Sequence, residues 1–199
     1  MDLPTKIIIV SSVTCWGLTP LLVVGHELGH ALAVLRTGRR ALVIVGHQPP
    51  LLKLQVGRLE LRLHPQLAIP EFHPLTDMSK ARGPYLGACR YDPRGLTAGQ
   101  LRSIMRGGPL ADIVTGLVFA GLGFVVADTS SILFMLAASG FVVSFLQGLM
   151  NLRPIREDKR ISDGAQMLSL KGLSDDAVPI PLPEPTASPA GSSFPPPGC

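Results

Sequence analysis

Two long stretches of this 199-residue sequence contain almost no charge. Between Ile7 and Leu35 there is no Lys or Arg, and between Gly107 and Leu152 the only ionisable side chains are Asp112 and Asp128. Charged residues make up 16% of the chain and hydrophobic residues 46%, with a mean hydropathy of +0.35. A composition this apolar argues against an ordinary soluble domain and indicates a membrane protein.

The sequence also lacks the signals of a secreted, disulfide-bonded protein. Its three cysteines, Cys15, Cys89 and Cys199, form neither a disulfide framework nor a metal-site spacing. The first apolar run has a weakly basic start and no A-x-A-like cleavage site before residue 26. We therefore expect a signal anchor that stays in the membrane, and not a cleaved signal peptide.

The apolar stretches are long enough for three membrane spans. About 20 apolar residues cross a hydrocarbon core of roughly 30 Å, so we place spans at about 7–35, 109–127 and 130–150. The predicted fold is an all-α integral membrane protein with a three-helix transmembrane core in a domain of residues 1–174. Residues 175–199 contain eight prolines and predict a disordered tail, either a ligand for a PxxP-binding partner or a solvated end.

The basic residues predict the orientation of these spans. The connector 36–106 carries twelve Lys or Arg against four acids, so the positive-inside rule places it in the cytoplasm. The N-terminus is then outside and the C-terminus cytoplasmic. Topology and anionic lipid account for the arginines, so no nucleic-acid partner is expected. The short loops suggest a prokaryotic plasma membrane.

Local patterns predict some structure inside the connector and a bend before it. Residues 51–65 alternate apolar and polar side chains around Gly57-Arg58, which predicts a cytoplasmic β-hairpin. Its free edge would pair with a substrate strand, or its leucine face would cover the cytoplasmic mouth of the protein. Residues 97–106 predict a short amphipathic helix capped by Thr97, lying on the membrane before Pro109 begins the second span. Pro20 should bend the first span.

The first span contains a polar motif, HELGH, at residues 26–30. His26 and His30 are four residues apart and share a helix face, so both can bind one Zn²⁺ ion, while Glu27 can act on a water at that ion. The alternatives are a chance match or polar residues satisfied by interhelical hydrogen bonds. Ionisable groups in a span cost roughly 2.5 to 3.5 kcal/mol each, which favours a functional site. Gly25 and Gly29 either admit a neighbouring helix or reflect ordinary glycine usage.

A catalytic zinc site needs a third protein ligand and an open position. The candidates are the remaining histidines, His47, His64 and His73, and acids elsewhere in the chain. The best candidate is Asp163, just beyond the third span, where the chain can return to membrane depth. The alternative for Asp163 is that it merely caps a helix that begins in SDGAQML.

Three motifs in this order resemble the site-2 protease family of intramembrane zinc metalloproteases. They are HELGH in the first span, GGPLAD (107–112) at the second, and NLRP with SDG (151–154 and 162–164) after the third. The resemblance covers roughly residues 7–170. It implies that His26, His30 and Asp163 bind zinc, that Glu27 is the general base, and that Asn151 binds substrate or stabilises the oxyanion.

The sequence departs from this family at two places. Asp112 stands where the family often has Asn, and a charged segment, RPIREDKRI, replaces the short apolar turn that many members have before the aspartate. That segment makes Asp158 a second candidate for the ligand role of Asp163.

The resemblance implies an endopeptidase that cleaves membrane-anchored proteins within or near the bilayer. The rival hypothesis is a non-proteolytic membrane protein that keeps the metal site to hold or scaffold a client. Glu27 discriminates between them, because a structural metal site tolerates Gln at this position and a hydrolase does not. A soluble thermolysin-like peptidase is excluded by the spans and by the lack of a globular substrate-binding domain.

Overall fold

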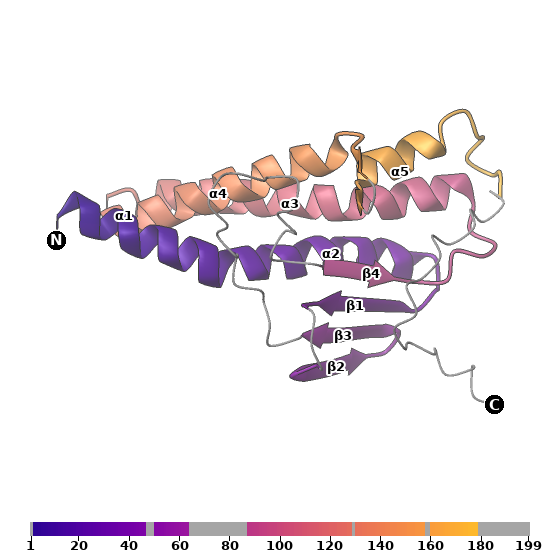
Figure 1. Cartoon of the computed structure of the whole chain (residues 1–199), viewed down its shortest axis with the longest axis horizontal. Helices are drawn as coiled ribbons and strands as arrows, with labels where there is room; N and C mark the ends of the chain where they lie inside the picture. The colour runs from indigo at the N-terminus through magenta and orange to yellow at the C-terminus, as the bar shows by residue number, and fades with distance from the viewer. Residues whose placement is uncertain (1, 47–49, 64–86, 129, 158–159, 179–199) are drawn as a thin grey trace.

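The computed structural model describes residues 2–46, 50–63, 87–128, 130–157 and 160–178. Long helices make up most of the molecule, and a small β-sheet lies beside one of them (Figure 1). Three helical segments are long and apolar enough to cross a membrane: Leu3–Arg36, Ala98–Val126 and Ser131–Leu152. The prediction of three long apolar helices is therefore confirmed.

The first of these segments is helical throughout but irregular before Pro20. It consists of α1 (Leu3–Ser12), a π-helical turn η1 (Val13–Leu18) and α2 (Thr19–Arg36). Pro20 lies in the first turn of α2, where a missing amide hydrogen is tolerated. The Thr19 hydroxyl donates to the Thr14 carbonyl over 2.9 Å within the widened turn. A π-helical turn therefore precedes Pro20, and the predicted bend at Pro20 stays a prediction.

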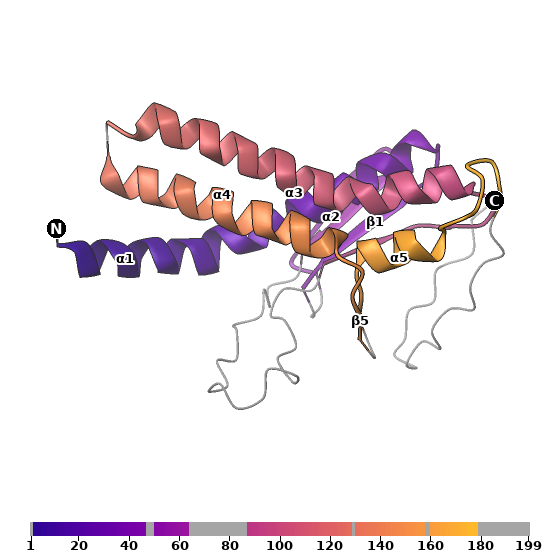
Figure 2. The same cartoon turned by 90° about the horizontal axis from the view of Figure 1, so that it is seen from above.

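The second segment, α3 (Ala98–Val126), begins eleven residues earlier than predicted. Thr97 caps it in a capping box with Gln100, as the sequence indicated. The separate amphipathic helix 97–106 was wrong, because α3 continues through Pro109, which is fully buried. Pro109 costs the helix one backbone hydrogen bond without ending it. The third segment, α4 (Ser131–Leu152), runs antiparallel to α3 and packs along it (Figure 2).

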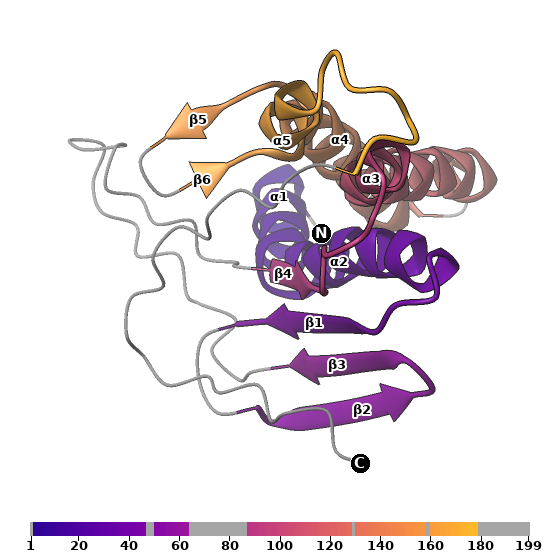
Figure 3. The same cartoon turned by 90° about the vertical axis from the view of Figure 1, so that its right-hand side faces the viewer.

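A four-stranded sheet corrects the all-α prediction. Its strands are β1 (Ala41–Val45), β2 (Leu52–Val56), β3 (Leu59–Leu63) and β4 (Gly87–Arg90), in the order β2-β3-β1-β4. β2 and β3 pair antiparallel across Gly57, but β3 also pairs in parallel with β1, and β4 completes the sheet. Figure 3 shows β4 nearest the helices and β2 farthest away.

The packed core lies at the end of the molecule that carries the sheet. Ala31 and Val34 of α2, Val43 and Val45 of β1, and Ile104 of α3 are buried together there. Along the rest of the bundle, large apolar side chains are exposed, among them Leu117 and Phe124. Exposed apolar surface on helices of this length fits a membrane environment.

The last described residues pack against the start of α3. The Ala98 amide donates to the Ala177 carbonyl over 2.7 Å and the Gly99 amide to the Asp175 carbonyl over 3.0 Å. Residues up to Ala177, beyond the predicted boundary at residue 174, thus contact α3. Residues 179–199, most of the predicted disordered tail, lie outside the described residues.

Helices α2 and α3 touch through their backbones at two glycines. A Cβ atom on Gly29 would overlap the Gly107 carbonyl oxygen and approach the Ala111 Cβ to 2.6 Å, and one on Gly107 would lie 3.1 Å from the Cα of His30. Gly25, one turn earlier, has nothing within 4 Å of its position for a Cβ. Gly29 therefore makes the close helix contact, and Gly25, just before the motif, does not.

We expect Gly29→Ala to lower the free energy of unfolding by about 1 to 3 kcal/mol, because an overpacked contact forces the two backbones apart. Denaturation of the detergent-solubilised protein, followed by circular dichroism, measures the change. Gly25→Ala is the matched control and should leave the stability unchanged. Equal stability of the two variants would contradict a close contact between α2 and α3.

Candidate metal centre

Helix α2 places the two motif histidines on its buried face. His26 and His30 are each less than one-tenth exposed, and their Nε2 atoms lie 3.2 Å apart. This proximity follows from the four-residue spacing, since residues i and i+4 of a helix stand above one another. The two imidazoles thus present one nitrogen each to a common point.

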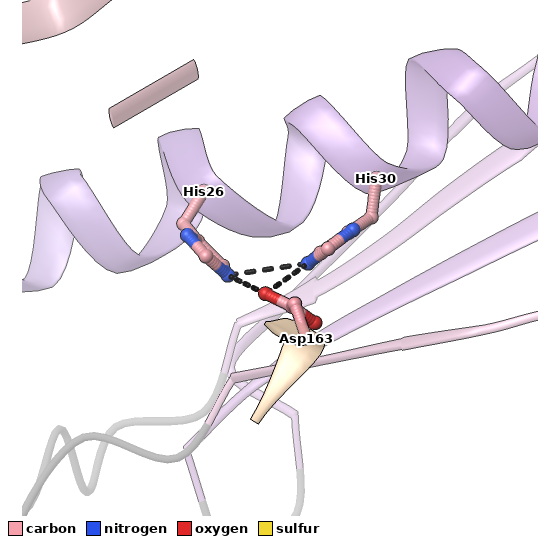
Figure 4. Close-up of side chains that lie close together, drawn as sticks. All are labelled: His26, His30 and Asp163. Carbon is pink, nitrogen blue, oxygen red and sulfur yellow. Dashed lines mark hydrogen bonds and ion pairs between the residues drawn. The ribbon is translucent and has the colours of Figure 1, made fainter. Parts of the chain in front are cut away.

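Asp163 approaches this point from α5 (Asp163–Ser169), far along the chain (Figure 4). One carboxylate oxygen, Oδ2, lies 3.4 Å from Nε2 of His26 and 3.4 Å from Nε2 of His30. Asp163 does not cap the helix, because the Ser162 hydroxyl accepts from the Ala165 amide over 3.2 Å and fills that role. The capping alternative for Asp163 is therefore wrong.

The charged segment before Asp163 is closed at its base by hydrogen bonds. The Ser162 amide donates to the Ile155 carbonyl over 3.1 Å, and the Ile155 amide donates to the Ser162 hydroxyl over 2.9 Å. Between them, β5 (Arg156–Glu157) and β6 (Arg160–Ile161) pair antiparallel. The segment thus loops out and returns to the end of α4, where a side chain on Gly164 would lie 2.5 Å from the Leu152 carbonyl carbon. This return brings Asp163 to the histidines.

His26, His30 and Asp163 form a group that could hold a metal ion. Zinc bonds of about 2.0 to 2.2 Å at tetrahedral angles separate neighbouring ligand atoms by roughly 3.3 to 3.6 Å. The triangle of ligand atoms has edges of 3.2, 3.4 and 3.4 Å, close to that spacing. Two imidazoles and one carboxylate leave a fourth tetrahedral position free, the arrangement of a catalytic site.

The outer nitrogens of both imidazoles have partners that fix the rings. Nδ1 of His26 lies 2.7 Å from Oδ2 of Asp112, and Nδ1 of His30 lies 2.7 Å from the Ile104 carbonyl oxygen. Both partners are acceptors, so we assign the proton to Nδ1 in each ring. Nε2 is then the unprotonated nitrogen available to a metal, and a carboxylate behind His26 makes that nitrogen a stronger ligand.

Gly108 of α3 borders the space between the histidines. A Cβ atom there would lie 2.6 Å from Nε2 of His26 and would also overlap Nε2 of His30. The absent side chain leaves room beside both ligand nitrogens. The GGPLAD motif therefore supplies two features of the centre, a glycine next to the nitrogens and the carboxylate of Asp112 behind His26.

Glu27 lies on the adjacent face of α2, against β4. A Cβ atom on Gly87 would lie 2.5 Å from Oε1 of Glu27, so the glycine of β4 leaves room for this carboxylate. Burial, aided by the nearby Glu27, raises the pKa of the Cys89 thiol to about 12. The thiol therefore stays protonated at neutral pH and is not a competing metal ligand.

Burial opposes the negative charge of Asp163, but the two imidazoles that its carboxylate faces outweigh burial and lower its pKa. Asp163 is therefore ionised at neutral pH, the form in which a carboxylate binds a metal.

Asn151, near the end of α4, is half-buried beside His26. Its Nδ2 atom lies 3.5 Å from Nδ1 of His26, a contact longer than an ordinary hydrogen bond. Among the described residues, this is the shortest polar contact of the Asn151 side chain. The other candidate ligands, His47, His64, His73 and Asp158, lie outside the described residues.

Comparison with known proteins finds no match to this chain among family models, curated proteins or solved structures. The resemblance to the site-2 protease family therefore rests on the sequence motifs.

We expect Gly108→Ala to abolish metal binding although it removes no ligand, because its methyl group would occupy the space beside both Nε2 atoms. Zinc per mole of purified protein, measured by inductively coupled plasma mass spectrometry, should fall close to zero. Gly121→Ala on the same helix, where a Cβ meets nothing within 4 Å, should retain the metal. Full zinc content in Gly108→Ala would contradict the placement of the site.

Asp112→Asn should weaken zinc binding by roughly 10- to 100-fold, since the amide no longer stabilises the Nδ1 proton of His26 as a carboxylate does. Competition with a chromogenic chelator measures the affinity. Asp128→Asn removes an exposed acid just beyond the far end of α3 and should leave the affinity unchanged. Unaltered zinc affinity in Asp112→Asn would exclude a role for this hydrogen bond in binding.

Proposed function

We propose that this protein is an intramembrane zinc endopeptidase, similar to the site-2 proteases, that cleaves membrane-anchored proteins within or near the bilayer. The observation that carries the proposal is that Asp163 of α5 meets His26 and His30, which lie inside a segment long and apolar enough to span a membrane. Ionisable groups are costly at such a position and are retained there for function.

The donor set supports zinc as the metal. Two neutral imidazoles and one carboxylate bind the ion without cancelling its charge, as in other hydrolytic zinc sites. When bound, zinc supplies Lewis acidity toward water and toward a peptide carbonyl. The residues of this chain supply the positioning and the proton transfers.

Glu27 has the role of general base in this proposal. Its carboxylate, one residue after His26, takes a proton from the attacking water and passes it to the nitrogen of the leaving amine. The carboxylate lies against Gly87 of β4. Asn151, next to His26, is placed to donate its amide hydrogens to the substrate or to the developing oxyanion.

An intramembrane substrate must be extended before its peptide bonds can react, because a helix hides its carbonyl groups in hydrogen bonds. Pairing with the hairpin edge was one of two roles that the sequence left open for residues 51–65, but β2 is the edge of the sheet far from the metal centre. β4 is the opposite edge and adjoins Glu27; within the described sheet it pairs with β1 alone. We therefore assign substrate strand pairing to β4.

The proposed setting is a prokaryotic plasma membrane, with the N-terminus outside and the C-terminus in the cytoplasm. The three apolar helices support a membrane location, and the excess of basic residues in 36–106 supports this orientation. The β-sheet and α5 would then lie at the cytoplasmic side.

The test is cleavage of a panel of single-span reporter proteins by the purified chain in proteoliposomes. We expect Glu27→Gln to retain stoichiometric zinc and to lose cleavage by roughly 10²- to 10⁴-fold, because the amide cannot accept the proton. Glu60→Gln, which removes a carboxylate on β3 paired with Arg62, is the control and should cleave normally.

Cleavage by Glu27→Gln at the wild-type rate would overturn the proposed mechanism. Zinc binding by the wild type without cleavage of any reporter would instead favour a protein that uses the metal to hold a client.

A further inference from the structure

A cavity separate from the metal centre opens beside the first turns of α3. Its volume is about 560 Å³, and it is lined by Gly99, Arg102, Ser103, Arg106, Leu110 and Asp175. Five of these residues come from one face of α3, at helical spacings of three and four. Pockets that bind small molecules have volumes of roughly 300 to 1,000 Å³, so the cavity can hold a polar headgroup.

The cavity carries uncompensated positive charge. Arg102 is ion-paired with Asp175 and donates to the carbonyls of Leu170 and Leu173 over 2.7 and 2.6 Å. Arg106 is exposed and has no acidic partner in the part of the chain that the structure describes. One carboxylate therefore faces two guanidinium groups, and the Ser103 hydroxyl adds a donor. These are the groups that bind phosphate oxygens.

The same face of α3 becomes apolar directly beyond the cavity. Leu110, Val114 and Leu117 follow Arg106 at spacings of four, four and three residues, and each is more than half exposed. They belong to a helix long and apolar enough to span a membrane. A change from arginine to exposed leucine and valine along one helix face is typical of the level where phospholipid headgroups meet acyl chains.

We propose that this cavity binds one anionic phospholipid, with its phosphate between Arg102, Ser103 and Arg106 and an acyl chain along Leu110, Val114 and Leu117. A soluble phosphate would use the polar half of this surface alone, so the apolar half favours a lipid. The proposal is independent of proteolysis, because lipid binding requires neither the metal nor Glu27.

The test is native mass spectrometry of the full chain in detergent, titrated with phosphatidylglycerol or with phosphatidylcholine of the same acyl chains. We expect the wild type to retain one phosphatidylglycerol with an affinity roughly tenfold higher than for phosphatidylcholine, because charge-assisted hydrogen bonds favour the anionic lipid. Arg106→Gln should remove this preference. Arg153→Gln, the matched control, removes an exposed arginine at the end of α4 and should keep it.

An equal loss of the preference in Arg106→Gln and Arg153→Gln would indicate unspecific attraction and would overturn the proposal. Two measurements on the wild type need no variant. In the first, lack of a preference for phosphatidylglycerol would overturn the proposal. Complete displacement of phosphatidylglycerol by millimolar glycerol phosphate would assign the cavity to a soluble phosphate and reject the lipid. Retention against glycerol phosphate supports the lipid.

Discussion

The backbone contact between Gly29 and Gly107 is the constraint on which the rest of the structure depends. Because no side chain separates α2 from α3 at this crossing, the Ile104 carbonyl comes within 2.7 Å of His30, and Gly108 lies beside both imidazoles. One turn further along α3, Asp112 reaches His26. A larger residue at the crossing would separate the two histidines from all three of these groups.

The buried polar groups of the centre are satisfied mainly by one another. His26, His30 and Asp112 are each less than one-tenth exposed. Nδ1 of His26 is hydrogen-bonded to Asp112, and Nδ1 of His30 to the Ile104 carbonyl, each over 2.7 Å. Leaving such groups unpaired in an apolar interior is costly, so the network favours a single arrangement of α2, α3 and the imidazoles. Asp163 adds a negative charge from a separate element, which ties α5 to the bundle.

Features encoded by neighbouring residues could be predicted from the sequence, and those that depend on distant contacts could not. The shared face of His26 and His30, the capping by Thr97 and the antiparallel pairing around Gly57 follow from local spacing. The parallel pairing of β1 with β3, the position of β4 beside Glu27 and the continuity of α3 through Pro109 depend on packing between segments far apart in the chain. The contact of Asp112 with His26, 86 residues away, was not predicted either, although an acid inside an apolar span is itself a signal of function.

Because hydrogen bonds join Ile155 to Ser162, the position of Asp163 does not depend on the length of the segment between these two residues. The two hydrogen bonds at the base bring the ends together whatever the number of residues between them. Doubling the length of such a loop adds only about 0.6 kcal/mol of closure entropy. This segment can therefore accept inserted residues, such as an engineered reporter domain, while the carboxylate of Asp163 stays at the same point.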